Sequence, residues 1–288
     1  MRGHNVKAYA KLNLALDVGQ LRDDGYHEMT MIMQTVSLSD DIRIERVGEG
    51  FSCVSNLRYI PNDERNLAVK AAGEFYARTG LSGGVRLFMA KRIPVGSGMG
   101  GGSADAAAVL RGLNSMHGHP LGKKALIELG GRVGSDVPFC IEGGTQLARG
   151  RGEILSPLTP LPQCHFVICK PNFSISTPEL FKKLDGVDIK CRPDVPGMAR
   201  ALENGDLRGV AQRMYNVFED VPDKRFETVA AIRRTLLDCG AMGAIMTGSG
   251  SAVFGVFDDG AAAARARDAL RRQQKFCVTA KNITSVPV

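Results

Sequence analysis

Hydrophobic and polar residues along this chain follow two different periods, and each period predicts a type of secondary structure. Alternation at every second residue predicts strands at 6–18, 32–47 (strand, turn, strand), 85–93, 164–171, 243–257 (two strands around a glycine turn) and 275–283. Spacing of three to four residues predicts helices at 66–80, 103–116, 123–134, 178–184, 195–204, 206–218, 222–239 and 260–273. Because strands and helices are mixed along the chain, we expect an α+β fold.

A change of composition near the middle of the chain predicts two domains. The chain has 288 residues, more than one typical domain holds. The stretch RGRGEILSPLTPLP (149–162) carries glycines and then prolines, as connecting segments do. We therefore expect an N-terminal domain at 1–155 and a C-terminal α+β domain at 156–288.

The stretch PVGSGMGGGSADAA (94–107) joins the strand predicted at 85–93 to the next helix, and five of its first nine residues are glycine. Glycine at this density loses much conformational entropy on folding, so the fold must need it. Ser103 is expected to be the N-cap of the helix, with Asp105 in its first turn. A glycine loop that opens a helix presents free backbone N–H groups, which bind anions and above all phosphate.

The residues of this loop suggest four interpretations, of which the first is excluded and the second is weakened. A GxxxxGK[ST] phosphate loop is excluded, since no such sequence occurs in the chain. Gly96, Gly98 and Gly101 match the dinucleotide pattern GxGxxG, but no strand ending in an acidic residue follows at the required distance. A different phosphate cradle, with Ser103 as a donor, and a glycine turn without a ligand both remain.

Composition and charge narrow the class of protein. The chain is 44% hydrophobic and 23% charged, as in globular proteins. Residues 1–19 lack the features of a signal peptide, and no apolar run approaches the roughly 18 residues of a membrane span. The formal charge of +7 is spread along the chain and suits an anionic small substrate as well as nucleic acid. The aromatic residues form no RNA-binding pattern, so we expect neither a nucleic-acid nor a membrane partner.

The cysteines predict a reducing environment. There are seven, at positions 53, 140, 164, 169, 191, 239 and 277. The number is odd, none of them forms a CxxC pair, and none has the spacing of a zinc site. We therefore expect buried, reduced thiols and a cytoplasmic protein.

Three motifs together resemble the GHMP kinases, a family that includes galactokinase, homoserine kinase and mevalonate kinase. The order Pro-x-Gly-x-Gly-Met-Gly-Gly-Gly-Ser resembles the second family motif, AKLNLALDV (10–18) the first, and TGSGSAVFGVF (247–257) the third. They occur in the family's order and span most of the chain. Two positions differ: Met99 replaces the usual leucine, and Ala104 stands where a second serine is frequent, which removes one phosphate donor.

Within the family, AKLNL, DGYHEM and GSDVPF are most similar to members that phosphorylate the 2-hydroxyl of a cytidyl diphosphate alcohol in the non-mevalonate isoprenoid pathway. The resemblance implies two α+β domains, the second ferredoxin-like, with the active site in the cleft between them. It implies ATP with Mg²⁺ held mainly by phosphate oxygens and water, so that no dedicated metal site is expected. The implied partners are the two small-molecule substrates, and we expect a monomer or a weak homodimer.

The resemblance also implies roles for particular residues. It gives a catalytic pair, Lys11 and Asp136. It gives substrate-binding residues Asn13, Tyr26, His27, Thr177 and Phe181, with Tyr26, His27 and Phe181 at the cytidine. It gives ATP-binding residues Asn66, Leu67, Pro94, Gly96, Gly98, Gly100, Gly101, Gly102 and Ser103, and it gives Gly248 and Gly250 in the third motif.

These residues suit phosphoryl transfer, which needs positioning and charge stabilisation. Asp136 would accept the proton of the acceptor hydroxyl, and Lys11 would stabilise that carboxylate and the transferring phosphoryl group. Each residue also has a plainer interpretation: a solvated lysine, a helix cap at Asp136 and a loop histidine at His27. His117 and His119 lack further ligands at metal-site spacing and predict a polar loop.

Three other functions remain as alternatives at this stage. The first is a GHMP kinase for a different small alcohol, of the homoserine or mevalonate type. The second is a dinucleotide-binding oxidoreductase, and the third is a basic nucleic-acid-binding module. The dipeptide Tyr26-His27 argues against the first, because acyclic alcohols offer no base to stack.

Overall fold

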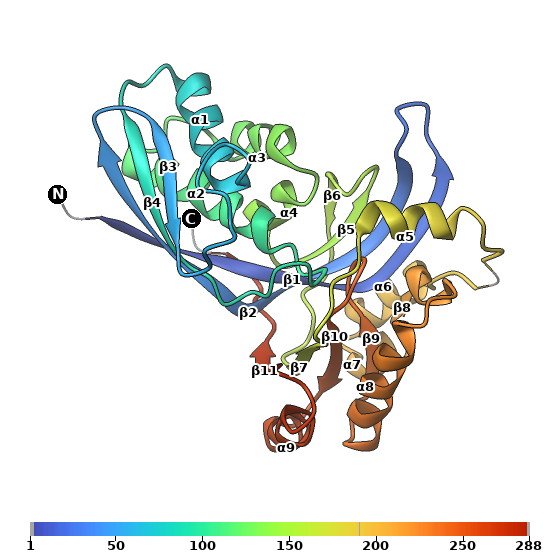
Figure 1. Cartoon of the computed structure of the whole chain (residues 1–288). Coiled ribbons are helices and arrows are strands. Elements are labelled where there is room, and N and C mark those ends of the chain that lie inside the picture. Colours follow the sequence, from blue (N-terminus) through green and yellow to red (C-terminus); the bar gives the residue numbers. More distant parts are fainter. Residues whose placement is uncertain (1–2, 190, 287–288) are drawn as a thin grey trace.

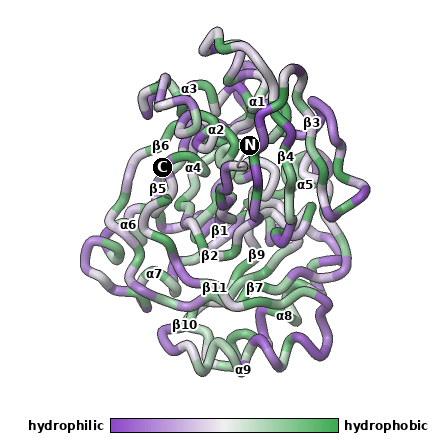
Figure 2. Tube along the Cα trace, turned by 90° about the vertical axis from the view of Figure 1, so that its left-hand side faces the viewer, coloured by the Kyte–Doolittle hydropathy of each residue, from purple (hydrophilic) through white to green (hydrophobic). Residues whose placement is uncertain are grey.

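The chain folds around two β-sheets, each covered by helices (Figure 1). The structure is a computed structural model that describes residues 3–189 and 191–286. None of the helices in these ranges is both long and apolar enough to cross a bilayer. In Figure 2 the hydrophilic colour gathers in the peripheral loops. The core contains large, fully buried side chains from both helices and strands, among them Phe75 and Phe254.

The first sheet has seven strands, and a long antiparallel pair forms its centre. The order is β3-β4-β2-β1-β8, with β5 beside β2 and β6 beside β5. Its strands are β1 (His4–Leu21), β2 (His27–Val47), β3 (Phe51–Ser55), β4 (Gly84–Ala90), β5 (Thr145–Arg149), β6 (Ile154–Pro157) and β8 (Tyr215–Asn216). A turn at Asp24-Gly25 joins β1 to β2, and Gly25 has the positive φ (79°) that such a turn needs.

Helices α1 (Leu67–Thr79), α2 (Gly101–Met116) and α4 (Val137–Glu142) pack on this sheet, and α3 (Lys123–Val133) packs on these helices. Helix α2 packs on β1 with a largely buried surface that is rich in alanine. The helix predicted at 66–80 is confirmed as α1. The Asn66 side chain accepts a hydrogen bond from the Ala68 N–H at its start, and Gly80 ends it with a left-handed φ of 68°.

The second sheet has four strands in the order β11-β7-β10-β9. They are β7 (His165–Lys170), β9 (Gly243–Met246), β10 (Val253–Phe257) and β11 (Phe276–Lys281). Helices α8 (Phe226–Asp238) and α9 (Gly260–Arg271) pack on this sheet. The remaining elements of this half are α5 (Thr177–Leu184), α6 (Val195–Glu203), α7 (Leu207–Gln212) and the short 3-10 helix η1 (Val217–Asp220).

The two halves of the chain share the first sheet. Strand β8 pairs in parallel with β1 at Ala15 and Leu16, and Val36 forms a bridge with Asn282. The boundary expected between residues 155 and 156 falls inside β6, which still pairs with β5 in the first sheet. The mixed arrangement of helices and strands confirms the predicted α+β class.

Two predicted elements are wrong. Residues 27–47 form one continuous strand, although SLSDD reads as a turn, because Asp40 is buried and paired rather than exposed. Its carboxylate accepts the N–H groups of Arg92 and Ile93 and pairs with Lys91. The helix predicted at 206–218 ends at Gln212 and is followed by β8 and η1.

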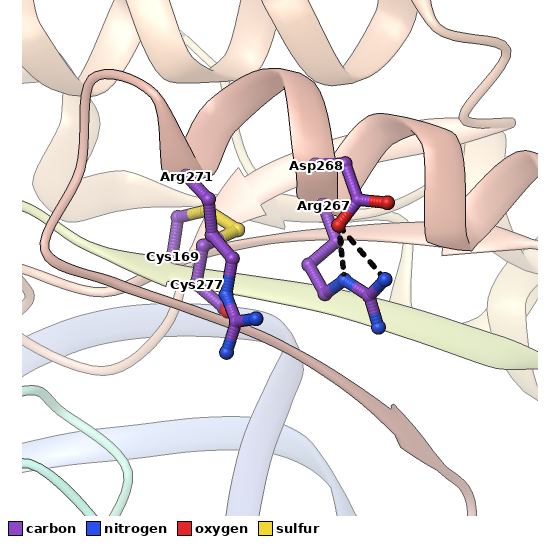
Figure 3. The surroundings of a disulfide bond; sticks show 5 residues. All are labelled: Cys169, Arg267, Asp268, Arg271 and Cys277. Carbon is purple, nitrogen blue, oxygen red and sulfur yellow. Dashed lines mark hydrogen bonds and ion pairs between the residues drawn. A yellow bond between two sulfur atoms is a disulfide. The ribbon is translucent and has the colours of Figure 1, made fainter.

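The expectation that all seven cysteines are buried, reduced thiols is also wrong. Cys169 and Cys277 form a disulfide, and Cys191 is exposed. The two bonded cysteines face each other on the antiparallel strands β7 and β11, 108 residues apart in sequence. Figure 3 shows the bond beside Arg271 of α9, whose guanidinium donates to the Cys277 carbonyl oxygen. A register of this kind brings thiols together that no local pattern connects.

Candidate active site

One cavity of about 610 Å³ is lined by residues from both halves of the chain. Every residue that the sequence analysis placed at the site lines this cavity except Asn13. Those lining it are Lys11, Tyr26, His27, Asn66, Leu67, Pro94, Gly96, Gly98, Gly100, Gly101, Gly102, Ser103, Asp136, Thr177, Phe181, Gly248 and Gly250. The fold thus brings together residues that lie as far apart in sequence as Lys11 and Gly250.

The glycine loop leaves β4 and enters α2, and three of its glycines have backbone conformations that favour glycine. The φ angles of Gly96, Gly98 and Gly100 are 62°, 78° and 66°. A Cβ at Gly98 would lie 2.1 Å from the Thr247 carbonyl oxygen, and a Cβ at Gly248 would lie 2.7 Å from that of Gly98. The glycines therefore allow the second and third motifs to touch through their backbones.

The first turn of α2 points its backbone N–H groups toward the loop and has no side-chain cap. Its N-cap is Gly100, so the expectation that Ser103 caps the helix is wrong: Ser103 is the third helical residue and lines the cavity. The backbone conformation of Gly100 starts the helix two residues earlier than the Ala-rich pattern indicates. Uncapped N–H groups at the positive end of a 16-residue helix form an anion site.

Lys11 and Asp136 meet at the cavity wall. The Lys11 side chain is almost fully buried, its backbone N–H donates to the Met99 carbonyl oxygen, and its Nζ lies 3.6 Å from Asp136 Oδ2. Asp136 occupies the N-cap position of α4, but its side chain accepts no capping hydrogen bond. That carboxylate remains partly exposed, at 29%, and is available to a ligand.

Asn13, expected at the substrate, instead lies beneath Lys11. Its side chain is fully buried, and its Oδ1 accepts a 2.7 Å hydrogen bond from Lys11 Nζ. The Asn13 backbone N–H donates to Thr247 Oγ1 (3.0 Å), and that hydroxyl donates back to Asn13 Oδ1 (3.3 Å). A buried polar chain therefore runs from the third motif through Asn13 to Lys11. The pattern of the sequence does not show this depth, because the partners of Asn13 include a residue 234 positions away.

A second buried cluster supports the glycine loop. Lys91 Nζ pairs with the carboxylates of Asp40 and Asp105, and all three side chains are nearly inaccessible. Burial, together with the nearby Asp40, raises the pKa of Asp105 to about 8. The expectation that Asp105 lies in the first turn of the helix is wrong: the helix starts at Gly101, and Asp105 lies beyond the first turn, buried in this cluster. This cluster ties β2, the end of β4 and α2 together.

The opposite end of the cavity is aromatic. The rings of His27 and Phe181 stack with centroids 5.2 Å apart and planes inclined by 20°. His27 Nδ1 is 3.1 Å from the Gly19 carbonyl oxygen, and its Nε2 is 3.2 Å from Asp185 Oδ1. Tyr26 is more than half exposed and lies within reach of the same space. Flat apolar faces beside polar ring nitrogens suit a nucleobase.

Thr177 begins α5 and connects it to the third motif. Its Oγ1 lies 2.6 Å from Ser249 Oγ, and both residues line the cavity. Sequence reasoning named Gly248 and Gly250 but missed Ser249 between them. It also missed Lys91 and Arg151, which line the cavity as well. Their signal was weak: Lys91 was taken as part of a strand, and Arg151 as part of a domain boundary.

Two family models match separate stretches of the chain. Residues 66–144 match the family model "GHMP kinases N terminal domain", and residues 198–275 match "GHMP kinases C terminal". The glycine loop lies in the first match and the third motif in the second. The chain therefore belongs to the GHMP kinase family.

Individual relatives point to one member of that family. A protein of Clostridium perfringens named 4-diphosphocytidyl-2-C-methyl-D-erythritol kinase is 44% identical over 94% of each chain. A crystal structure of 4-(cytidine 5′-diphospho)-2C-methyl-D-erythritol kinase matches with a TM-score of 0.82 at 33% identity, covering 96% of this chain and 98% of the other. Homoserine kinase from Cytophaga hutchinsonii matches with a TM-score of 0.77 over 99% of this chain and 96% of the other, but at 18% identity, and so shares the fold.

Proposed function

We propose that this protein transfers the γ-phosphate of ATP to the 2-hydroxyl of 4-diphosphocytidyl-2-C-methyl-D-erythritol, in the non-mevalonate isoprenoid pathway. The observation that carries the proposal is the set of residues that line one cavity. A helix-opening glycine loop, a buried lysine facing a carboxylate, and an aromatic cluster all line it. The relatives with the same named activity support it.

In this proposal Asp136 accepts the proton of the acceptor hydroxyl. Its partly exposed carboxylate faces the cavity, where a hydroxyl can reach it. Lys11 Nζ, fixed by the Asn13 amide oxygen, stabilises the negative charge that spreads over the transferring phosphoryl oxygens. A rigid lysine is already oriented and loses little free energy to reorganisation during the reaction.

The donor would lie along the glycine loop. Backbone N–H groups of Gly101, Gly102 and Ser103 at the start of α2 would hold its phosphates, and Asn66 and Leu67 would border the adenine. ATP would enter as its Mg²⁺ complex, with the ion held by phosphate oxygens and water. Within residues 3–189 and 191–286, no group of three or more His, Cys, Asp or Glu side chains is arranged to hold a metal.

The acceptor would place its cytosine at the aromatic end. Tyr26, His27 and Phe181 offer ring faces for stacking, and the contacts of the His27 nitrogens with the Gly19 carbonyl oxygen and Asp185 hold that ring in place. A homoserine- or mevalonate-type kinase needs no such cluster, because its acceptor carries no base. We propose a cytoplasmic location, where ATP is available. The Cys169–Cys277 disulfide is not a feature expected of a protein in the reducing cytoplasm.

The test is turnover of the proposed pair of substrates. Purified protein, ATP, Mg²⁺ and the cytidyl diphosphate acceptor should release ADP at a rate well above a control without acceptor. Asp136→Asn should lose most of kcat while ATP binding changes little, since its charge is lost and its shape is kept. Absence of acceptor-dependent ADP would refute the reaction. Near-normal kcat in the Asp136→Asn variant would refute the assignment of the base.

A further inference from the structure

The turn between β5 and β6 holds an arginine for which the proposed mechanism has no role. Arg151 lies between Gly150 and Gly152, whose φ values of 72° and 113° allow the sharp turn. The Gly150 N–H donates to Glu28 Oε1 (2.9 Å), and the Arg151 N–H donates to Glu153 Oε2 (2.6 Å). The backbone that carries the Arg151 side chain is therefore held in place.

The position of the Arg151 side chain is intermediate between the two ends of the acceptor site. Its guanidinium carbon lies 5.0 Å from the centroid of the Tyr26 ring, at the aromatic end. The adjacent Gly152 packs beside the catalytic carboxylate, since a Cβ there would lie 3.6 Å from Asp136 Oδ1. Arg151 itself lines the cavity. It therefore stands between the aromatic cluster and the catalytic pair.

Arg151 also differs from the other lysines and arginines of the cavity in its charge partners. The other three have partners at close range: Lys11 contacts Asn13 and Asp136, Lys91 pairs with Asp40 and Asp105, and Arg65 pairs with Asp63. Among the described residues, the recorded ion-pair contact of Arg151 is with Glu153 Oε1 at 3.9 Å, longer than a hydrogen bond. Its five N–H donors are thus available to a ligand.

An acceptor of the proposed class carries a diphosphate between its nucleoside and its alcohol. If the base lies at Tyr26 and the hydroxyl at Asp136, the diphosphate passes Arg151. We propose that Arg151 binds this diphosphate through its guanidinium and so selects a nucleoside diphosphate alcohol over an uncharged nucleoside. The planar guanidinium can donate two parallel hydrogen bonds to a phosphate group, which a lysine cannot do. This inference rests on the proposed function.

Binding of cytidine and CDP tests the inference without turnover. Titration calorimetry would be carried out with saturating ADP and Mg²⁺, so that the donor site is occupied. The wild-type protein should bind CDP at least about tenfold more tightly than cytidine, the effect of one good charge-assisted contact. In Arg151→Met the ratio should fall to nearly one, and in Arg151→Lys it should be intermediate. Arg149→Met removes an exposed arginine two positions earlier and should keep the wild-type ratio.

Kinetics provide the second measurement. Arg151→Met should raise the KM for the acceptor about tenfold and leave the KM for ATP within about twofold, because only the acceptor contact is lost. Its thermal unfolding temperature should match that of the wild type. An unchanged ratio of CDP to cytidine affinity in Arg151→Met would overturn the inference and leave the kinase function standing. A wild-type protein that neither binds CDP nor phosphorylates the acceptor would overturn both.

Discussion

Replacing Thr247 with valine should weaken the link between the third motif and Lys11, the lysine that we propose to be catalytic. The Thr247 hydroxyl accepts the Asn13 backbone N–H at 3.0 Å and donates to Asn13 Oδ1 at 3.3 Å. Asn13 Oδ1 in turn accepts the hydrogen bond from Lys11 Nζ. Both Thr247 and Asn13 are fully buried, so the freed amide N–H gains no contact with bulk water.

The structure sets the size of the expected effect. Valine keeps the volume of threonine, so the loss comes from polar groups rather than from a cavity. A buried donor left without an acceptor costs about 1–3 kcal/mol, and we expect a loss of about 2 kcal/mol in the free energy of unfolding. Serine keeps the hydroxyl and removes one methyl group, which costs about 1 kcal/mol. Thr247→Val should therefore destabilise the protein more than Thr247→Ser.

Urea unfolding of the two variants and the wild type measures this order directly. Steady-state kinetics should show a kcat about tenfold lower in Thr247→Val, because Asn13, the hydrogen-bond partner of Lys11, is no longer held in place by the Thr247 hydroxyl. The KM for ATP should stay near its wild-type value. Thr247→Ser should retain most of kcat. If serine proves the more destabilising of the two, packing rather than the hydrogen-bonded chain dominates at Thr247, and the reasoning fails.

Three further predictions concern the loop, the buried charges and the base site. Burial raises the pKa of Asp105 to about 8, whereas in the unfolded state this carboxyl loses its proton near pH 4. The stability of the wild type should therefore fall as the pH rises between these two values, relative to that of Asp105→Asn. Parallel pH profiles of the urea midpoints would contradict this. Gly98→Ala should lower the free energy of unfolding by more than about 2 kcal/mol, since its Cβ would lie 2.1 Å from the Thr247 carbonyl oxygen. Gly118→Ala is the control: its φ of 74° is similar, but no atom lies within 4 Å of the added Cβ, so the loss should be only about 1 kcal/mol. Equal losses in thermal unfolding would refute the clash at Gly98. His27→Ala should raise the KM of the acceptor more than that of ATP, and equal increases would argue against its place at the base.

The local patterns of the sequence predicted most of the secondary structure. Helix α1 lies within the predicted range and ends at Gly80 as predicted, because helical periodicity and a left-handed φ are properties of neighbouring residues. The strand–loop–helix order around residues 94–107 was also correct. The continuous strand β2 was not predictable, because the residue that reads as a turn, Asp40, is satisfied by partners about 50 positions away.

The sequence by itself determined the family, the motifs and many of the residues that line the cavity, because glycine, lysine and aromatic positions in a fixed order limit what the chain can bind. Only the tertiary structure decided that Asn13 is buried behind Lys11, that Arg151 stands between Tyr26 and Asp136, and that Cys169 meets Cys277. Each of these depends on the register of strands or on the packing of turns far apart in sequence. Periodicity records which face of an element is apolar, but the partner of a buried polar group is fixed only when two elements meet.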